Sequence, residues 1–78
     1  MKTFIIFCRE EKDKLAQIIE HLKLGEKVVV HNEHETFYGT GFERWLTEGL
    51  SELTYAMECT EHDQFYGYGV TFEITLLS

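Results

Sequence analysis

The first 32 residues have the pattern of a strand, a helix and a second strand, and this order constrains the fold more than any other feature of the chain. Residues 2–8 and 27–32 are apolar on both faces of a two-residue repeat, which is typical of strands that are covered on both sides. A strand–helix–strand crossover is right-handed in about 98% of cases, and its two strands are parallel. The sequence therefore predicts two parallel strands joined by one helix.

Residues 10–24 have the pattern of an amphipathic helix. Acidic side chains in the first turn and Lys23 in the last turn complement the helix dipole. Gly25 is predicted to end the helix in a left-handed conformation. The apolar stripe of this helix consists of Leu15, Ile18, Ile19 and Leu22.

A second helix is predicted to begin at Thr40, because Thr40 and Glu43 have the spacing of a capping box. Apolar residues then recur at helical spacing, and the helix is expected to end near Ser51. Trp45 lies on this stripe and is predicted to be a core residue. Residues 36–39 are predicted to form a short strand before the helix.

The C-terminal third alternates between apolar and polar residues in two runs, 53–60 and 66–76, which predicts a β-hairpin. Placing both apolar sets on one face fixes the parity of the pairing. The simplest register places Tyr55 opposite Val70 and leaves residues 61–64 as the turn. Glu58 would then lie beside Gly67, in a flat patch that is covered by a helix of the chain itself or by a partner protein.

These elements predict an α+β fold for a single domain of residues 1–78. We expect a mixed sheet of four or five strands with two helices mainly on one face. The expected order is βαβ(β)αββ, a ferredoxin-like variant with a C-terminal hairpin.

Two features of the chain bear on its compartment. No apolar run approaches the ~20 residues that span a membrane, and the apolar stretch at residues 4–8 is too short for a signal peptide. Cys8 and Cys59 allow at most one disulfide and are predicted to be free, buried thiols. Together these features predict a cytoplasmic protein.

Charge is divided unevenly along the chain, although a net charge of −7 is itself ordinary for a small domain. Residues 1–30 carry six basic and five acidic side chains, whereas residues 31–78 carry nine carboxylates and one cation, Arg44. Such a field repels nucleic acid and anionic membranes and favours a basic partner. We therefore expect a basic protein surface as the partner, and no direct contact with nucleic acid or membrane.

Four side chains of metal-ligand type occur at close local spacing. They are His31, His34, Cys59 and His62. Zinc accepts such ligands, but structural zinc sites usually contain more cysteines. Exposed loop histidines are the favoured interpretation, with a metal-stabilised module as the alternative, and no cofactor is predicted.

The sequence offers no nucleophile and base with a third orienting group, so the protein is predicted not to be an enzyme and no catalytic residue is assigned. The run from His31 to Glu35 has the composition of a polar loop. A helix start beside Cys8 would favour a thiolate, but Glu10 and Glu11 follow directly and oppose it.

The combined features predict a small acidic protein-interaction module, an inhibitor that occupies the basic, nucleic-acid-binding surface of a partner enzyme. Its carboxylates would take the place of phosphates, and its tyrosines would anchor the interface. In size, acidity and lack of proline the chain resembles virus-encoded inhibitors of host enzymes, a likeness that carries no motif. A homo-oligomer is the alternative, because two helices can leave one face of the sheet uncovered. The predicted partner-binding residues are Glu33, Glu35, Glu58, Glu61, Asp63, Tyr66 and Tyr68.

Overall fold

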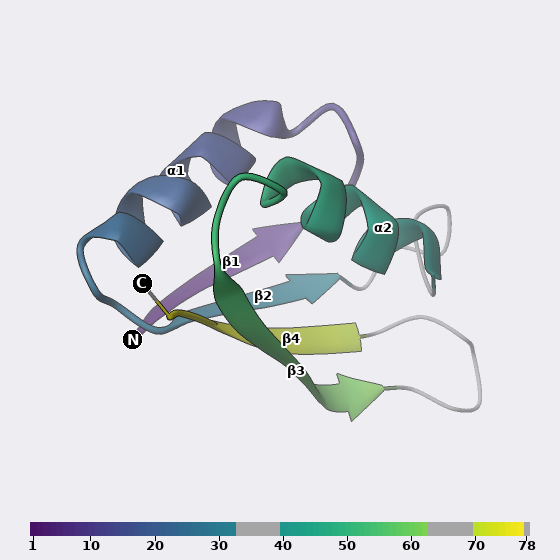
Figure 1. The fold of residues 1–78 in the computed structure, drawn as a ribbon. Coiled ribbons are helices and arrows are strands. Elements are labelled where there is room, and N and C mark those ends of the chain that lie inside the picture. The colour runs from purple at the N-terminus through teal and green to yellow at the C-terminus, as the bar shows by residue number, and fades with distance from the viewer. Residues whose placement is uncertain (33–39, 63–69, 78) are drawn as a thin grey trace.

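The computed structural model describes residues 1–32, 40–62 and 70–77, which form one mixed sheet and two helices (Figure 1). The spatial order of the strands is β1-β2-β4-β3. This arrangement confirms the predicted α+β fold. Residues 36–39, predicted as an additional strand, lie outside the described residues. The elements along the chain are β1 (Lys2–Ile6), α1 (Lys12–Lys23), β2 (Val28–Asn32), α2 (Thr40–Gly49), β3 (Tyr55–His62) and β4 (Val70–Leu76).

The N-terminal crossover is confirmed. Strands β1 and β2 are parallel, with Lys2 opposite Val28 and Ile6 opposite Asn32. Strand β4 then pairs antiparallel with β2 on one side and with β3 on the other. The N-terminal unit and the C-terminal hairpin therefore share one continuous sheet, joined along β2 and β4.

Helix α1 ends as predicted at Gly25, whose φ of 87° lies in the left-handed region. The Gly25 N–H donates to the Leu22 carbonyl at 3.0 Å, and the Glu26 N–H donates to the His21 carbonyl at 3.2 Å. These two bonds form a Schellman motif and satisfy carbonyls that the last turn would otherwise leave unpaired. The chain thereby turns sharply from α1 into β2.

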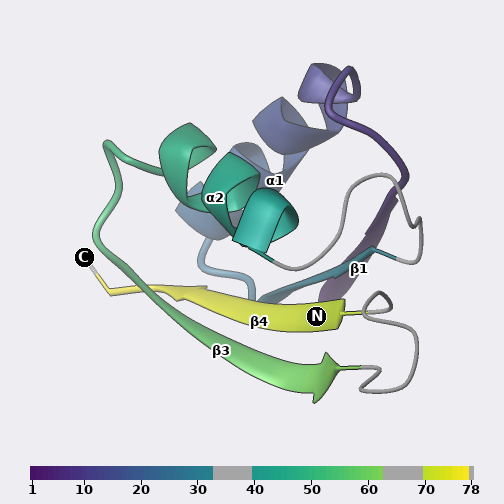
Figure 2. The same cartoon turned by 90° about the vertical axis from the view of Figure 1, so that its right-hand side faces the viewer.

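Both helices lie on the same face of the sheet (Figure 2). The core fills the layer between the two helices and the sheet, and α1 and α2 each contribute one apolar stripe to it. Its fully buried members include Ile18 and Leu22 from α1, Phe42 and Leu46 from α2, Leu50 directly after α2, and Ile6, Val28, Val30 and Ile74 from the strands.

The opposite face of the sheet has no helix over it among the described residues. In β1, Phe4 and Ile6 point into the core, whereas Ile5 between them is 46% exposed. The prediction that the first strand is covered on both sides is therefore wrong. Ile5 is exposed because both helices pack on one side of the sheet and because β1 is an edge strand.

The predicted register of the hairpin is also wrong. Tyr55 lies opposite Leu76, six residues beyond the predicted Val70. Glu58 consequently lies opposite Glu73, so the predicted flat patch beside Gly67 does not form at this position.

The parity of the hairpin is nevertheless correct, because Met57 lies opposite Ile74 on the apolar face. An irregularity between Cys59 and Glu61 then shifts the pairing by one residue, as a β-bulge does. The pattern of apolar residues therefore specifies which faces of β3 and β4 coincide. The length of the connection between the strands specifies which residues lie opposite each other.

Candidate functional site

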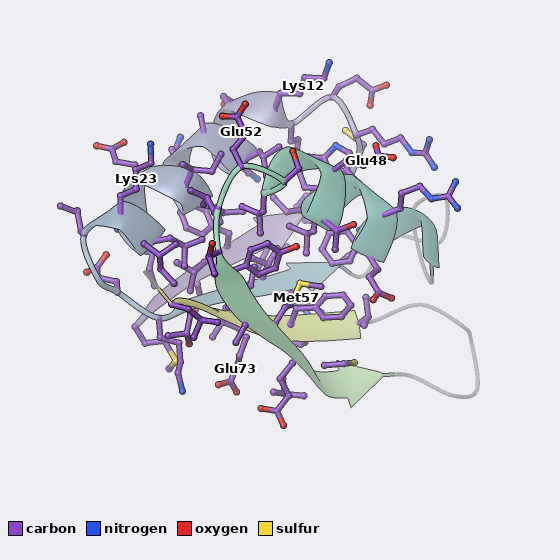
Figure 3. All side chains as sticks on the ribbon, in the orientation of Figure 1. Lys12, Lys23, Glu48, Glu52, Met57 and Glu73 are labelled. Atoms are coloured by element: carbon purple, nitrogen blue, oxygen red, sulfur yellow. The ribbon has the colours of Figure 1, made fainter. Side chains whose placement is uncertain are left out.

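The uncovered sheet face is divided into an apolar side and an acidic side. Because side chains alternate along a strand, the residues next to the buried ones point to this face. Ile5 and Val29 lie on its apolar side, on β1 and β2. Glu58 and Glu73 lie on its acidic side, on β3 and β4. The Glu73 side chain points away from the helices (Figure 3).

Glu58 and Glu73 are direct cross-strand neighbours. Lys27 Nζ lies 3.2 Å from Glu73 Oε1, so one cation from the N-terminal half stands against two carboxylates. A hollow of about 120 Å³ lies beside these three residues. Its local charge is therefore negative even after the ion pair is counted.

The other described carboxylates of the C-terminal half lie on the helix side. Glu43 and Glu48 are exposed on α2, and Glu52 follows it (Figure 3). The uneven charge along the sequence therefore does not become one acidic surface among the described residues. The reason is that α2 lies on one side of the sheet and the Glu58–Glu73 pair on the other.

The chain leaves the sheet at two neighbouring points on one end. Asn32, the last residue of β2, and His62, the last residue of β3, both lie opposite Val70. With strands about 4.8 Å apart, the two exits are separated by about 10 Å. The segments that begin with Glu33 and Asp63 therefore start from the same end of the sheet.

Most of the predicted partner-binding residues fall on these two segments. Glu61 lies in β3 opposite Thr71, although its side chain is not among those described. Of this set, the structure thus describes the side chain of Glu58 alone. Those outside the described residues are Glu33, Glu35, Asp63, Tyr66 and Tyr68.

Of the four alternative metal ligands, the structure describes the side chains of His31 and Cys59, and it does not bring these two together. His31 Nδ1 lies 2.6 Å from Thr71 Oγ1 and points to the uncovered face. Cys59 lies opposite Phe72, a core residue, and so belongs to the other face. His34 lies outside the described residues, and the His62 side chain is not described. Among the described residues, no three side chains of metal-ligand type form a group.

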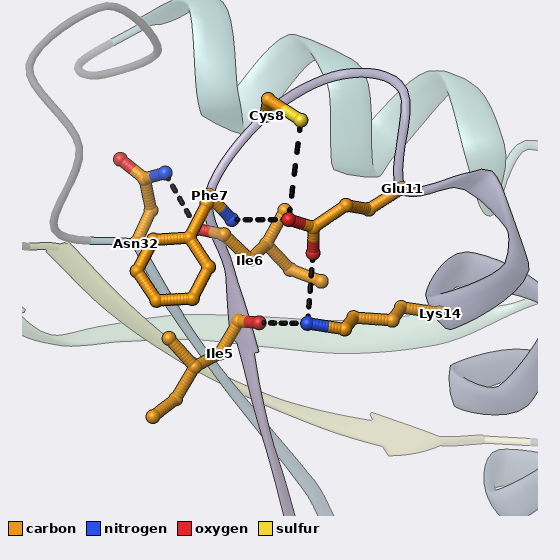
Figure 4. A network of polar contacts seen from close by, with 7 residues as sticks. All are labelled: Ile5, Ile6, Phe7, Cys8, Glu11, Lys14 and Asn32. Atoms are coloured by element: carbon orange, nitrogen blue, oxygen red, sulfur yellow. Dashed lines mark hydrogen bonds and ion pairs between the residues drawn. The ribbon is translucent and has the colours of Figure 1, made fainter.

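The turn between β1 and α1 is held by Glu11 (Figure 4). Glu11 Oε1 accepts a hydrogen bond from the Phe7 N–H at 3.3 Å and lies 3.9 Å from Cys8 Sγ. Lys14 Nζ lies 2.9 Å from Glu11 Oε2 and donates to the Ile5 carbonyl at 2.9 Å. The start of α1 is thus tied to the end of β1.

The pKa of the Cys8 thiol lies above its ordinary value. The Glu10 backbone, through a hydrogen bond, lowers this pKa, but the Glu10 side chain, burial and the negative charges of Glu10 and Glu11 together raise it by more. Neither Cys8 nor Cys59 forms a disulfide, as predicted, but Cys8 is half-buried and Cys59 is exposed, so the prediction that both thiols are buried is wrong. The neutral thiol at Cys8 agrees with a structural role.

Sequence reasoning missed a pocket on the helix side of the molecule. It is lined by Arg9, Gly41, Arg44, Trp45 and Glu48. The only signal available in the sequence was the rarity of two of these residue types, because the lining includes both arginines and the single tryptophan of the chain. Thirty-five positions separate the arginines, and no periodicity connects them.

Comparison of the chain with protein-family models, curated proteins and solved structures gave no match in any of the three. Neither described helix is long and apolar enough to cross a bilayer. A fold by itself does not determine function, so the functional assignment depends on the geometry of these sites.

Proposed function

We propose that the chain is a protein-interaction module that binds a basic surface of a partner through the acidic side of its uncovered sheet face. The partner surface is of the kind that contacts nucleic acid, and the module would inhibit the partner by occupying it. Lysine and arginine side chains that neutralise phosphates can equally be neutralised by carboxylates.

The observation that carries this proposal is the pairing of Glu58 with Glu73 on the uncovered face. Like charges directly opposite each other on neighbouring strands destabilise a sheet. A residue choice that costs stability is typical of a functional surface. Lys27 pairs with Glu73, which leaves the two carboxylates with one unbalanced negative charge for a basic partner.

Two further features extend the acidic surface in this proposal. The exits at Asn32 and His62 flank Val70, so the segments that carry Glu33, Glu35 and Asp63 join the same end of the sheet. Glu61 lies near that end, within β3. Tyr66 and Tyr68 would supply aromatic contacts on one of these segments. Ile5, half exposed on the apolar side of the face, would add an apolar contact.

The proposal is tested by capture on the immobilised protein from a lysate freed of nucleic acid. We expect the captured proteins to be nucleic-acid-binding proteins that are released by duplex DNA and by high salt, because the contact is ionic. Glu58→Gln combined with Glu73→Gln should abolish most of this capture.

The matched control is Asp13→Asn combined with Glu20→Gln, which removes the same charge from exposed positions on α1. This variant should capture as the wild type does. Capture that is indifferent to DNA and salt, or that falls equally in both variants, would overturn the proposal.

Self-association is the alternative outcome, since the apolar side of the same face would also suit a second copy of the chain. Sedimentation analysis distinguishes self-association from binding to a basic partner. A dimer that dissociates on Ile5→Lys, in a chain that captures no basic protein, would replace the proposed function with a homo-oligomeric one.

A further inference from the structure

We propose that the pocket between the β1–α1 turn and α2 binds the phosphoryl group of a small phosphate ester. The pocket has a volume of about 190 Å³ and is lined by Arg9, Gly41, Arg44, Trp45 and Glu48. It lies on the helix side of the molecule, whereas the Glu58–Glu73 pair lies on the uncovered face. The inference is therefore independent of the proposed function.

The first reason is the placement of positive charge. Nine of the 14 carboxylates of the chain lie in residues 31–78, where Arg44 is the only cation. The fold nevertheless brings Arg44 and Arg9 to the walls of one pocket. Guanidinium groups offer fixed forks of N–H donors that match the oxygens of a phosphate.

The second reason is that the Arg9 guanidinium lies against the first turn of α2. Gly41 lies in the first turn of α2, and Arg9 Nη2 would be 3.4 Å from a Cβ atom placed there. The first turn of a helix also presents N–H groups without helical acceptors, together with the positive end of the helix dipole. An anion in the pocket would thus meet the arginines and the start of a ten-residue helix.

The third reason is that the walls of the pocket are held in place. Trp45 Nε1 donates to the Arg9 carbonyl at 3.2 Å and so connects α2 to the turn that carries Arg9. The Trp45 ring also stacks on Phe42, a fully buried core residue, with the two planes 17° apart. The pocket therefore exists before any ligand binds, which lowers the entropic cost of binding.

Size and charge narrow the ligand. The pocket is smaller than the 300 Å³ or so at which drug-sized sites begin, so it suits a phosphoryl group with a small attached part. With two guanidiniums and one carboxylate among its lining side chains, the pocket has a net positive charge, which favours an anion. Glu48, which lines the same pocket, is an acceptor for the hydroxyl groups of an attached sugar.

Trp45 gives a direct readout, because it is the only tryptophan of the chain. Its fluorescence is followed while inorganic phosphate, or ribose 5-phosphate, replaces sodium chloride at constant ionic strength. We expect a saturable change with each phosphate. Tighter binding of ribose 5-phosphate identifies a sugar phosphate as the ligand class, and equal binding identifies the phosphoryl group alone.

Arg44→Gln should weaken binding about tenfold or more, since it removes charge-assisted hydrogen bonds. Arg44→Lys should also weaken it, because the lysine ammonium lacks the fork. Arg44 is exposed on α2, so both variants should keep the far-ultraviolet circular dichroism of the wild type.

Lys23→Gln is the matched control, because Lys23 is an exposed cation in the last turn of α1, outside the pocket (Figure 3). It should bind phosphate as the wild type does. The absence of a saturable fluorescence change, or an equal loss of affinity in Lys23→Gln and Arg44→Gln, would overturn the inference.

Discussion

A Cβ atom placed on Gly49 would lie 2.3 Å from Cδ2 of Leu15, so the last turn of α2 contacts a side chain of α1 directly. Non-bonded carbon atoms normally keep about 3.5–4.0 Å apart. Glycine at this position therefore sets how closely the two helices approach over the core.

The first prediction concerns this contact. Gly49→Ala should lower the free energy of unfolding by about 1 kcal/mol, because overpacking outweighs the helix propensity that alanine gains. Urea unfolding measures the change. In a Leu15→Ala background the same substitution should be neutral or stabilising, since the opposing methyl groups are gone. An equal effect in both backgrounds would show that Leu15 does not limit the approach.

The second prediction concerns Asn32, which is fully buried and donates from Nδ2 to the Ile6 carbonyl at 2.8 Å. Asn32→Asp should lower the free energy of unfolding by about 3 kcal/mol at neutral pH, because it leaves a buried carboxylate facing a carbonyl.

Burial would raise the folded-state pKa of the introduced acid, so the destabilisation should shrink as the pH falls through that value. The protonated acid can then donate to the Ile6 carbonyl. Unfolding curves from pH 7 to acid test this, with Asn32→Leu as the control that carries no titrating group. A loss that does not change with pH would contradict the burial of this side chain.

The third prediction concerns the end of α1. Hydrogen bonding to His21 lowers the pKa of Glu26. Burial opposes this shift, and the charges of His21, the N-terminus and Lys2 lower the pKa further, so the net direction is down. A depressed carboxyl pKa stabilises the fold above the unfolded-state value, about 4.3, and this contribution is lost as the pH falls through the folded-state pKa.

Glu26→Gln should therefore be less stable than the wild type at neutral pH and approach it in acid. Thermal unfolding at a series of pH values measures the difference. Glu20→Gln removes the same charge from α1 without the His21 contact and should leave stability nearly unchanged at neutral pH. A difference that widens in acid would have the wrong sign for this linkage.

The fourth prediction separates stability from binding on the uncovered face. Glu58→Gln should raise the free energy of unfolding by about 0.2–1 kcal/mol, because it removes the repulsion from Glu73. The gain should fall at high salt, where charges are screened. Glu52→Gln, an exposed position after α2, should show no such gain. A destabilised Glu58→Gln variant would mean that the two carboxylates do not repel.

The sequence was most informative where local chemistry decides structure. The positions of α1 and α2 follow from apolar spacing, and Gly25 ends α1 because a left-handed residue was required there. The parallel pairing of β1 with β2 follows from the handedness of the crossover.

Non-local features were beyond sequence reasoning. Alternation places Met57 and Ile74 on one face, but it cannot distinguish registers that differ by an even number of residues. The apolar pattern of β1 does not reveal that both helices pack on one side of the sheet. The meeting of Arg9 with Arg44 depends on how α2 lies over the β1–α1 turn, which no local pattern encodes.

The hydrogen bond from Lys14 to the Ile5 carbonyl also affects the tendency of the protein to aggregate at high concentration. The adjacent Ile6 carbonyl accepts from Asn32 on β2, so the Ile5 carbonyl points toward the free edge of the sheet. Unpaired edge groups are templates on which foreign strands can polymerise. Here an ammonium group already occupies one of the few acceptors on a five-residue edge, which opposes fibril growth from β1.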